Sequence, residues 1–354
     1  MRIRDLFAGP AGWDEGAASL GLHDILGIEW DPDACATAEA AGHARAGRTV
    51  TVRTGKRDKR VREGADVALL DPYETCGPDL DGLIASPPCQ GFSMAGKGLG
   101  RRDSARIIRA VGDLAAGRDC LPELRGHIKD PRSALALEPL RWALAVEPDW
   151  TCWEQVPAVL PLWEACAEAL RADGYSVWTG DVQAEQYGVP QTRKRAVLIA
   201  SRYRQVGRPV PTHSRYHSRT PDKLDPGVQK WVSIADALPY VSGYFRTDDQ
   251  DRASARPVAN APAATIKGGN GGGSCLEVGF VKEPGHRVSA SSAARKGGPQ
   301  GRRATIREVG LLQAFPADYP WQGSKTAQYR QVGDAVPPLL AAHVLAEATG
   351  YALP

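Results

Sequence analysis

The sequence lacks the features that would place it in a membrane or in an oxidising compartment. Its 354 residues contain no uncharged apolar run near the 18 residues that a membrane span requires. The first residues run directly into Gly9, Pro10 and Gly12, without the apolar core of a signal peptide. The seven cysteines are odd in number and form no C-x-x-C pair, so neither a disulfide framework nor a zinc ribbon fits. We therefore expect a cytoplasmic protein in a reducing environment, with no metal and no membrane contact.

Basic charge is concentrated in one part of the chain, although the formal net charge of the whole is only +3. Residues 202–303 hold 17 Lys and Arg against 8 Asp and Glu, a net charge of +9, so the remainder carries −6. A basic segment on an acidic body is typical of a module that faces a polyanion. A solvated, loop-rich surface is the alternative interpretation of the same pattern.

Short apolar runs alternate with helical patterns over the first 200 residues, which predicts a mostly parallel sheet covered on both faces. The rhythm stops after Ser201, and the Pro-, Gly- and Ser-rich stretch to about Arg303 indicates a separate irregular module. Strand-like runs lie at 3–7, 25–29, 67–70, 83–86, 151–154, 175–182 and 196–200. Helical patterns lie at 13–20, 33–41, 133–146, 160–170, 305–314 and 339–348.

The ends of the first three strand-like runs carry residues suited to a nucleotide-like ligand. Gly9 and Gly12 follow the first run, where glycines allow a close backbone approach at the carboxyl end of a strand. Glu29 can accept hydrogen bonds from ribose hydroxyls, and Trp30 can stack on a base. Asp66 opens the next run and can accept from an adenine amino group. An exposed acid beside a core tryptophan explains Glu29 and Trp30 equally well.

A cysteine follows the run at 83–86 in an unusual setting. Pro87 and Pro88 restrict the backbone just before Cys89, which places the thiol at a rigid strand end. The glycines that follow make a segment able to close over a site. A small buried hydrophobe is the ordinary role of a lone cysteine, but it suits this polar, glycine-rich setting less well.

Two further polar groups stand at strand-like positions. Glu154, flanked by Trp153 and Val156, is placed to be partly desolvated, as a general acid requires; a surface acid is the alternative. Arg193 and Arg195 alternate, so on one continuous strand they would share a face. They would then serve either a ligand or ordinary salt bridges.

Five short motifs occur in a fixed order, and together they carry a resemblance to a known family. The chain resembles the DNA cytosine-5 methyltransferases in the order and spacing of these motifs. The match excludes residues 202–303 and the stretch 107–128. To the stretch 107–128 we assign no role. The motifs are Phe7-Ala8-Gly9, Pro88-Cys89-Gln90, Trp153-Glu154-Gln155-Val156, Gln191-Thr192-Arg193-Lys194-Arg195 and Arg330-Gln331-Val332-Gly333-Asp334-Ala335-Val336-Pro337-Pro338.

The resemblance implies a Rossmann-like class I methyltransferase fold, with a mixed α/β sheet between helices and a smaller, irregular, β- and loop-rich target-recognition domain. Residues 1–201 and 304–354 would form the catalytic and cofactor-binding domain, and 202–303 the recognition domain. The implied reaction transfers a methyl group from S-adenosylmethionine to C5 of a flipped-out cytosine in a specific double-stranded DNA sequence. The implied protein is a monomer in a bacterial or viral host cytoplasm. A cognate restriction endonuclease cannot be inferred from the sequence.

The resemblance also assigns roles to individual residues. The nucleophile that adds to cytosine C6 is Cys89, and the N3 partner is Glu154. Arg193 and Arg195 orient the base or stabilise its site. Further substrate contacts fall to Gln90, Ser93 and Gln191. The cofactor set is Phe7, Gly9, Gly12, Glu29, Trp30, Asp66, Pro88, Asp334 and Ala335.

Three positions depart from the commonest family residues. Ala11 replaces a glycine, and Gln155 and Asp334 each replace an asparagine. An acid at 334 near a sulfonium either steadies the ordinary donor or favours a donor whose transferred group is larger or cationic. Methylation of structured RNA is a rival within the superfamily, against which the large basic module argues. A catalytically dead DNA-binding regulator is the rival from another class, against which Cys89, Glu154 and Arg195 argue.

Overall fold

The computed structural model describes residues 1–54, 57–88, 92, 103–240, 243–246, 260–267, 276–279 and 301–354. They belong to two compact units. The first comprises Met1–Val182, Lys194–Val210 and Ala341–Pro354, and the second Gln183–Arg193 and Pro211–Leu340. The functional domains expected from the sequence divide the chain differently and stay a prediction.

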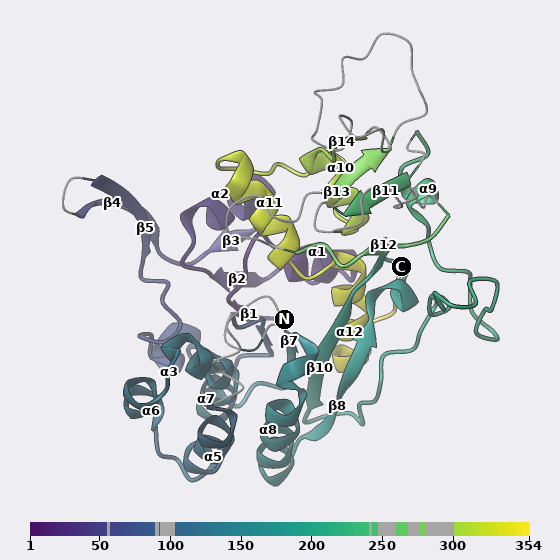
Figure 1. Cartoon of the computed structure of the whole chain (residues 1–354). Helices are drawn as coiled ribbons and strands as arrows, with labels where there is room; N and C mark the ends of the chain where they lie inside the picture. The colour runs from purple at the N-terminus through teal and green to yellow at the C-terminus, as the bar shows by residue number, and fades with distance from the viewer. Residues whose placement is uncertain are drawn as a thin grey trace. The chain divides into compact units, whose positions relative to one another are not determined.

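Seven strands form the central sheet of the first unit, in the order β3-β2-β1-β6-β7-β10-β8 (Figure 1). The five strands from β3 to β7 run parallel, and β10 joins β7 antiparallel. The expected mixed α/β sheet is confirmed. The strands are β1 (Ile3–Leu6), β2 (Ile25–Ile28), β3 (Ala44–Arg45), β6 (Gly82–Ala85), β7 (Trp150–Gln155), β8 (Ser176–Gln183) and β10 (Lys194–Ser201).

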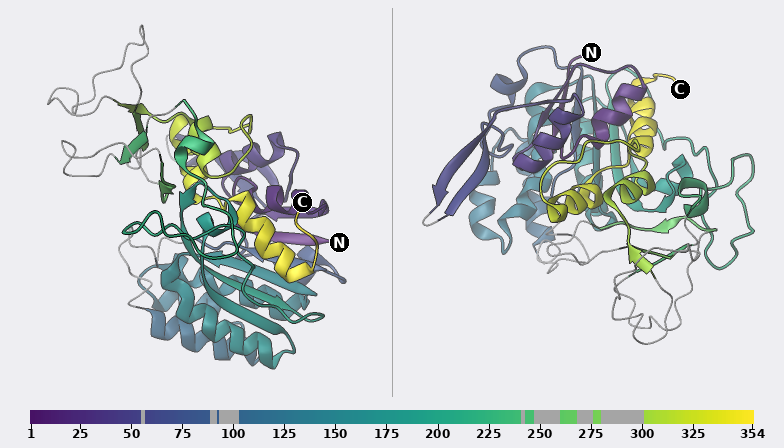
Figure 2. Two further views of the ribbon diagram at one scale, coloured as in Figure 1. Left: turned by 90° about the vertical axis from the view of Figure 1, so that its right-hand side faces the viewer. Right: turned by 90° about the horizontal axis from the view of Figure 1, so that it is seen from above.

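Helices cover both faces of this sheet. Figures 1 and 2 show α5, α7 and α8 on one face and α1 and α12 on the other. In the described part of the chain, no helix has the length and apolarity needed to cross a bilayer. The helices of this unit are α1 (Gly12–Ser19), α2 (Pro32–Ala40), α3 (Pro72–Cys76), α5 (Ser104–Ala115), α6 (Leu121–His127), α7 (Glu138–Val146), α8 (Leu160–Ala172) and α12 (Pro338–Thr349), with short 3-10 turns η1 (Pro131–Leu137) and η2 (Pro157–Val159).

The alternation of side chains along each strand divides the core between the two faces. Leu83 and Trp153 point to the face covered by α5, α7 and α8, where the rings of Trp153 and Trp163 meet edge to face at 5.5 Å. Cys152, the neighbour of Trp153, points to the other face, where its sulfur lies 4.0 Å from the carbonyl oxygen of Val344 on α12. Burial on both faces explains the successive apolar residues Leu83, Ile84 and Ala85 of β6.

The stretch 107–128 supplies part of the core. α5 is amphipathic and buries Ile107, Val111 and Leu114 in the main hydrophobic cluster. α6 follows after a short turn and adds the fully buried Leu121. The structural role that the motif comparison left unassigned is therefore to cover one face of the sheet.

The structure differs from the sequence analysis at two places. Residues 67–70 form a turn rather than a strand, because the Asp66 carboxylate accepts from the amide of Ala68 and its carbonyl from the amides of Leu69 and Leu70. The second difference is a two-stranded hairpin of β4 (Arg48–Thr54) and β5 (Arg57–Glu63), which the sequence analysis did not anticipate. The hairpin extends away from the sheet of its own unit (Figures 1 and 2).

The second unit consists of small sheets and short helices. Its helix α10 begins at a capping box, in which Thr305 and Glu308 satisfy each other's backbone amides. β12 pairs with β9, and β11, β13 and β14 form a three-stranded sheet. Its described elements are η3 (Ala184–Tyr187), β9 (Gln191–Thr192), α9 (Ile234–Ala237), β11 (Gly243–Arg246), β12 (Ala263–Ala264), β13 (Leu276–Gly279), β14 (Gly301–Arg303), α10 (Ile306–Leu312) and α11 (Lys325–Asp334).

The packing of α5 yields a stability prediction. Ile107→Ala removes a fully buried side chain and should lower the free energy of unfolding by about 2–5 kcal/mol. Arg109→Ala, on the exposed face of the same helix, should change it by no more than about 0.5 kcal/mol. Urea denaturation followed by circular dichroism measures both. Equal effects of the two variants would contradict the assignment of α5 to the core.

Candidate functional site

The turn after β1 has a strained backbone. Phe7, Gly9 and Ala11 all have positive φ angles, of 60°, 54° and 76°. A residue with a side chain adopts this region at a cost of roughly 1–2 kcal/mol, and such strain gathers at functional sites. An added Cβ at Gly9 would meet no atom within 4 Å, so open space lies beside the turn. Ala11 adopts the left-handed conformation that the family's usual glycine would take at lower cost.

Glu29 connects this turn to the end of β2. Its two carboxylate oxygens accept from the amide of Gly9 at 2.9 Å and from that of Asp31 at 2.7 Å. Burial raises the pKa of Glu29, and these two hydrogen bonds partly offset the rise. The next side chain, Trp30, is 62% exposed. A carboxylate with unused lone pairs therefore lies beside an open indole face, as expected for binding a ribose and a base.

A buried guanidinium lies beneath the same turn. Arg45 on β3 forms a two-pronged ion pair with Asp14 on α1, with both N–O distances 3.1 Å. Neither side chain is more than 1% exposed. The Arg45 guanidinium also contacts the carbonyl of Gly9 at 3.4 Å. Gly27 makes room for it, because a Cβ there would lie 2.4 Å from Nη1 of Arg45.

Arg45 also acts on two further buried acids, Asp5 and Glu29, because its positive charge lowers the pKa of each. Burial raises the pKa of Asp5 on β1 well above its ordinary value, Asp14 and Glu29 raise it further, and Arg45 opposes the rise. The sequence analysis missed Arg45, Asp14 and Gly27. No local signal marks them, because an Arg or Asp on a short amphipathic element is normally exposed.

The ends of β6 and β7 are held together by hydrogen bonds that involve two of the candidate motifs. Gln155 at the end of β7 donates to the carbonyl of Pro87 at 2.5 Å and accepts from the amide of Val156 at 2.5 Å. Ser86 accepts from the indole of Trp13 at 2.8 Å. The backbone immediately before Pro88 is thus fixed from two sides.

Glu154 and Arg195 form an ion pair at this edge. Nε of Arg195 lies 2.7 Å from Oε1 of Glu154, and both side chains are largely buried. The antiparallel register of β7 and β10 brings them together, since Glu154 lies opposite Val197. Cys89, Gln90 and Ser93 lie outside the described residues.

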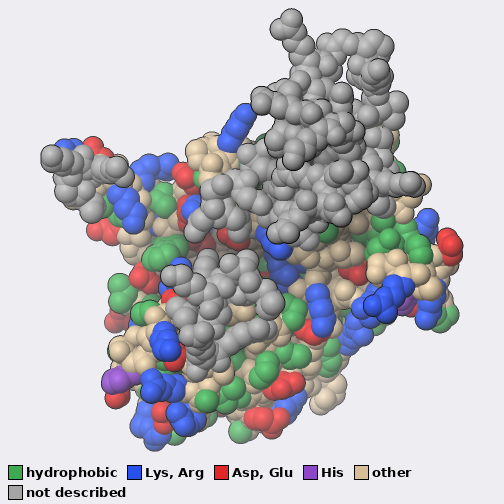
Figure 3. Space-filling model, in the orientation of Figure 1, with side chains coloured by type: hydrophobic (Ala, Val, Ile, Leu, Met, Phe, Trp, Pro, Cys, Tyr) green, Lys and Arg blue, Asp and Glu red, His purple; other side chains and the backbone are tan. Residues whose placement is uncertain are grey.

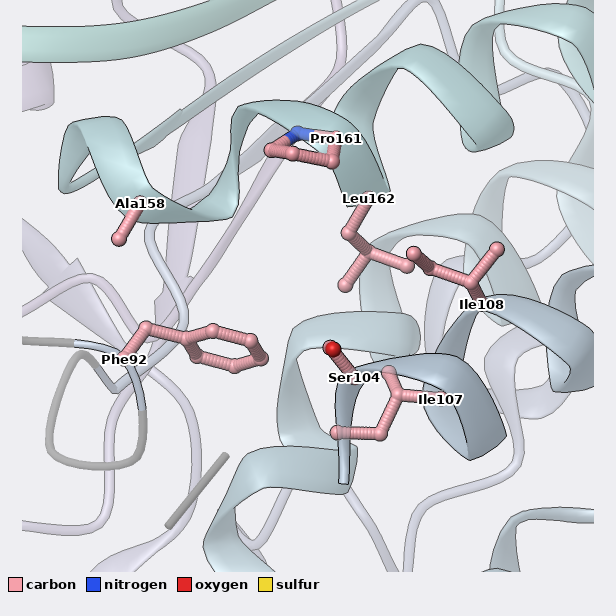
Figure 4. Close-up of a pocket in the computed structure, with 7 residues that line it drawn as sticks. All are labelled: Phe92, Ser104, Ile107, Ile108, Ala158, Pro161 and Leu162. Atoms are coloured by element: carbon pink, nitrogen blue, oxygen red, sulfur yellow. The ribbon is translucent and has the colours of Figure 1, made fainter. Parts of the chain in front are cut away.

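Phe92 is the described residue that lies nearest to Cys89 on its carboxyl side. Its buried ring faces Ile107 and Leu162 across a cavity of about 130 Å³ between α5 and the start of α8 (Figure 4). Ser104, Ile108, Ala158 and Pro161 complete the lining. Phe92 therefore belongs to the main hydrophobic cluster of the first unit.

Arg193 and Gln191 belong to the second unit, and the expectation of a single strand face for Arg193 and Arg195 was wrong. The strand breaks between β9 and β10, at Arg193. The buried Arg193 guanidinium donates to the carbonyls of Ile266 at 3.1 Å and Gly333 at 3.0 Å. Such contacts replace the strand pairing that alternation assumes.

Two buried glutamines complete this network. Gln191 donates to Gln313 and to the carbonyl of Leu312, and accepts from the amide of Ile266 at 2.8 Å. Gln313 in turn donates to the carbonyls of Val332 at 2.7 Å and Ala335 at 3.1 Å. The segment of Gly333, the exposed Asp334 and Ala335 is therefore held by side chains from distant parts of the sequence. The sequence analysis missed Gln313, because a glutamine at a helix end carries no signal of burial.

Among the residues that the structure describes, no group of His, Cys, Asp and Glu side chains could hold a metal ion. A comparison with protein families identifies the family of this chain. A family model of C-5 cytosine-specific DNA methylases matches residues 1–349. The chain belongs to this family. It is a DNA cytosine-5 methyltransferase.

Curated relatives of this methyltransferase agree. The type II methyltransferase M1.HphI of Haemophilus parahaemolyticus is 28% identical over 97% of this chain and 85% of its own length. The type II methyltransferase M.HgiDI of Herpetosiphon aurantiacus is 25% identical over 96% and 92%.

Solved structures show the same fold. The Dnmt2 methyltransferase of S. pombe aligns with a TM-score of 0.63 and 16% identity over 99% of this chain and 98% of its own. A putative DNA modification methyltransferase encoded within an E. coli prophage aligns with a TM-score of 0.54 and 18% identity over 99% of each chain.

The buried ion pair of the methyltransferase yields a second stability prediction. Arg45→Met removes the buried cation that Asp14 contacts at 3.1 Å and leaves it with the more distant His43 at 3.9 Å, so it should lower the free energy of unfolding by about 3–5 kcal/mol. Asp14→Asn combined with Arg45→Met should cost less than the sum of the single variants, with a coupling above about 1 kcal/mol. Chemical denaturation of the four proteins measures this cycle. Additive losses would show that the two groups do not depend on each other.

A pH prediction follows from Glu185 in η3. This carboxyl is 1% exposed, and burial raises its pKa from 4.5 to about 7. A raised pKa stabilises the fold below pH 4.5, and this contribution is lost as the pH rises to about 7. Glu185→Gln should therefore weaken the fall in unfolding free energy between pH 4.5 and 7.5, by about 3 kcal/mol at 1.36 kcal/mol per pKa unit. Denaturation at a series of pH values tests it, and parallel profiles of the two proteins would contradict it.

Proposed function

We propose that this enzyme methylates C5 of a flipped-out cytosine in a specific double-stranded DNA sequence, with Cys89 as a covalent nucleophile. The observation that carries the proposal is the ion pair of Glu154 and Arg195, at the sheet edge where Gln155 fixes the backbone leading into Pro88 and Cys89. A nucleophile, an acid and a cation from three motifs meet the requirements of this chemistry.

S-adenosylmethionine is the methyl donor that we propose. The open Trp30 face, the Glu29 carboxylate and the space beside Gly9 fit its adenosine part. When bound, it supplies an electrophilic methyl group on a sulfonium. Phe7, Gly12, Asp66 and Pro88 complete the cofactor set in the first unit, and we assign Asp334 and Ala335 of the second unit to the same ligand.

The steps at the base follow from the chain's own residues. The Cys89 thiolate forms a bond to C6, and the ring's electron pair moves towards C5 while a proton from Glu154 reaches N3. C5 then takes the methyl group. A base removes the C5 proton, the electron pair of that C–H bond re-forms the C5–C6 double bond as the C6–S bond breaks, and N3 returns its proton to Glu154. Arg195 holds the Glu154 carboxyl in place, and Arg193 acts through Gly333 and Ile266 as a positioning residue. Gln90, Ser93 and Gln191 are the further substrate-side residues of the proposal.

The position of Gln155 supports an ordinary methyl donor. Its amide is occupied by Pro87 on one side and Val156 on the other, so it serves the backbone of the site. The substitution of the family's asparagine therefore needs no unusual donor to explain it.

Nucleoside mass spectrometry tests the reaction. Unmethylated plasmid incubated with the protein and S-adenosylmethionine should yield deoxycytidine heavier by one methyl group. Cys89→Ser should abolish the product, and Glu154→Gln should lower the rate about 10²- to 10⁴-fold, as expected for loss of an acid catalyst. Cys120→Ser is the matched control, because this half-buried thiol at the start of α6 has no role in the proposal.

A trapping experiment separates the covalent mechanism from the net reaction. On DNA in which 5-fluorocytosine replaces every cytosine, the C5 substituent cannot leave as a proton, so a Cys89 adduct should survive denaturing electrophoresis. Absence of the adduct with the wild type would overturn the covalent step. DNA binding without any modified cytosine would instead favour a catalytically dead regulator.

A further inference from the structure

The hairpin of β4 and β5 is a strongly basic segment of the first unit. Residues 48–63 contain seven Lys and Arg against two Asp and Glu, a net charge of +5 in 16 residues. The chain outside residues 202–303 carries a net charge of −6, and the part of it that lies outside the hairpin carries −11. Because each strand has seven residues, the ribbon is about 24 Å long.

Side chains on β5 fix the base of this hairpin to the body of its unit. Arg62 pairs with Glu39 on α2 at 2.6 Å and donates to the carbonyl of Ala46 at 2.9 Å. Arg60 pairs with Asp33, also on α2, at 3.1 Å. A free two-stranded ribbon is at best marginally stable in water, so these anchors give it a defined direction.

The ribbon leaves the same edge of the sheet that carries the candidate site. β3 runs parallel to β2, and β4 begins three residues after Arg45, beyond the carboxyl end of β3. Asp33, the partner of Arg60, is in the first turn of the helix that follows Trp30. The basic ribbon and the Glu29–Trp30 turn are thus attached to one edge of the first unit.

The ribbon presents cations to solvent from its base to its outer end. The side chains of Arg48 and Arg53 are 79% and 67% exposed, and Lys59 is exposed as well. Figure 3 shows basic side chains along this arm, with acidic ones between them. Arg48 pairs with Glu63 and Arg53 with Asp58, but both acids are themselves 58% exposed. Ion pairs in water are weak, so these guanidinium groups can exchange a carboxylate for a phosphate at little cost.

We propose that the β4–β5 ribbon binds the phosphate backbone of duplex DNA beside the methylation site, through Arg48, Arg53 and Lys59. The proposal rests on the proposed function for the identity of the duplex. Charge complementarity selects the occupant: the net charge of +5 suits a polyanion, and exposed Arg, Lys and Thr side chains are the usual partners of phosphate oxygens. A length of about 24 Å spans roughly seven base pairs at 3.4 Å each. Such contacts add affinity independent of sequence.

The salt dependence of DNA binding tests the proposal. Arg48→Gln/Arg53→Gln/Lys59→Gln removes three cations and spares the anchors Arg60 and Arg62. The slope of log K against log salt concentration, measured by fluorescence anisotropy on a labelled 40-base-pair DNA duplex of mixed sequence, should become less negative by between about 1 and 2.7. Affinity at 0.1 M salt should fall about tenfold or more. Because the loss is one of counterion release, the two lines should converge towards 1 M salt.

The control removes the same charge elsewhere in the unit. Arg109→Gln/Arg118→Gln/Arg171→Gln replaces three arginines on the helices α5 and α8 and at the end of α5, of which Arg118 and Arg171 are in exposed ion pairs. This variant should keep the wild-type slope. Both variants should keep the wild-type affinity for S-adenosylmethionine and the wild-type circular dichroism spectrum.

The outcomes test the role of the ribbon and the proposed function separately. A wild type that methylates plasmid, with a ribbon variant of unchanged slope, would overturn the ribbon's role and leave the function standing. Equal changes of the slope in the ribbon and control variants would mean that only the net charge matters. That result would also overturn the ribbon's role. A change confined to a 40-base-pair RNA duplex would overturn the assignment to DNA. A wild type that binds DNA but does not methylate it would refute the proposed function, while the slopes still test the ribbon.

Discussion

The buried ion pair of Arg45 and Asp14 is the constraint on which the first unit's candidate site depends. It places a guanidinium beneath a strained turn, where the positive charge of Arg45 opposes the raised pKa values of two buried acids, Asp5 and Glu29. Removal of a charge from water is costly unless a partner compensates it, so each member of the group requires the others. Gly27 belongs to the same arrangement, since any side chain there would displace the guanidinium. The turn that carries Phe7 and Gly9 is therefore supported by electrostatics as well as by the packing of Phe7 against the hydrophobic core.

Buried amides serve a comparable purpose at two other positions. Gln155 fixes the backbone before Pro88, and Gln313 fixes the segment of Gly333 and Ala335. A glutamine offers both donors and an acceptor, so one side chain satisfies two or three backbone groups that would otherwise be buried unpaired. These residues define the shape of loops on which the candidate ligand-binding groups are carried. The departure at position 155 from the family's asparagine is thus explained by a structural role.

Much of the first unit's architecture could be predicted from local patterns. Short apolar runs predicted β1, β2, β6, β7, β8 and β10, and helical spacing predicted α1, α2, α8, α10 and α12, because burial imposes the periods of two and 3.6 on the sequence. The strand predicted at 67–70 was wrong, because the carboxylate and the carbonyl of Asp66 accept hydrogen bonds from the amides of the following residues. These hydrogen bonds form a turn and leave those amides without a bond to a neighbouring strand. The hairpin was missed because its alternation of Thr, Val and Arg resembles a solvated loop when apolar runs are the signal.

The sequence by itself determined the family, the order of the motifs and the set of residues that we propose to carry the chemistry, because motif order and residue type are properties of the chain. Only the tertiary structure decided which of those residues meet. It paired Glu154 with Arg195 across an antiparallel register, separated Arg193 from Arg195 by a break in the strand, and buried Arg45 beside Asp14. Each of these contacts joins segments distant along the chain, and their energies depend on burial and register, which no local pattern contains.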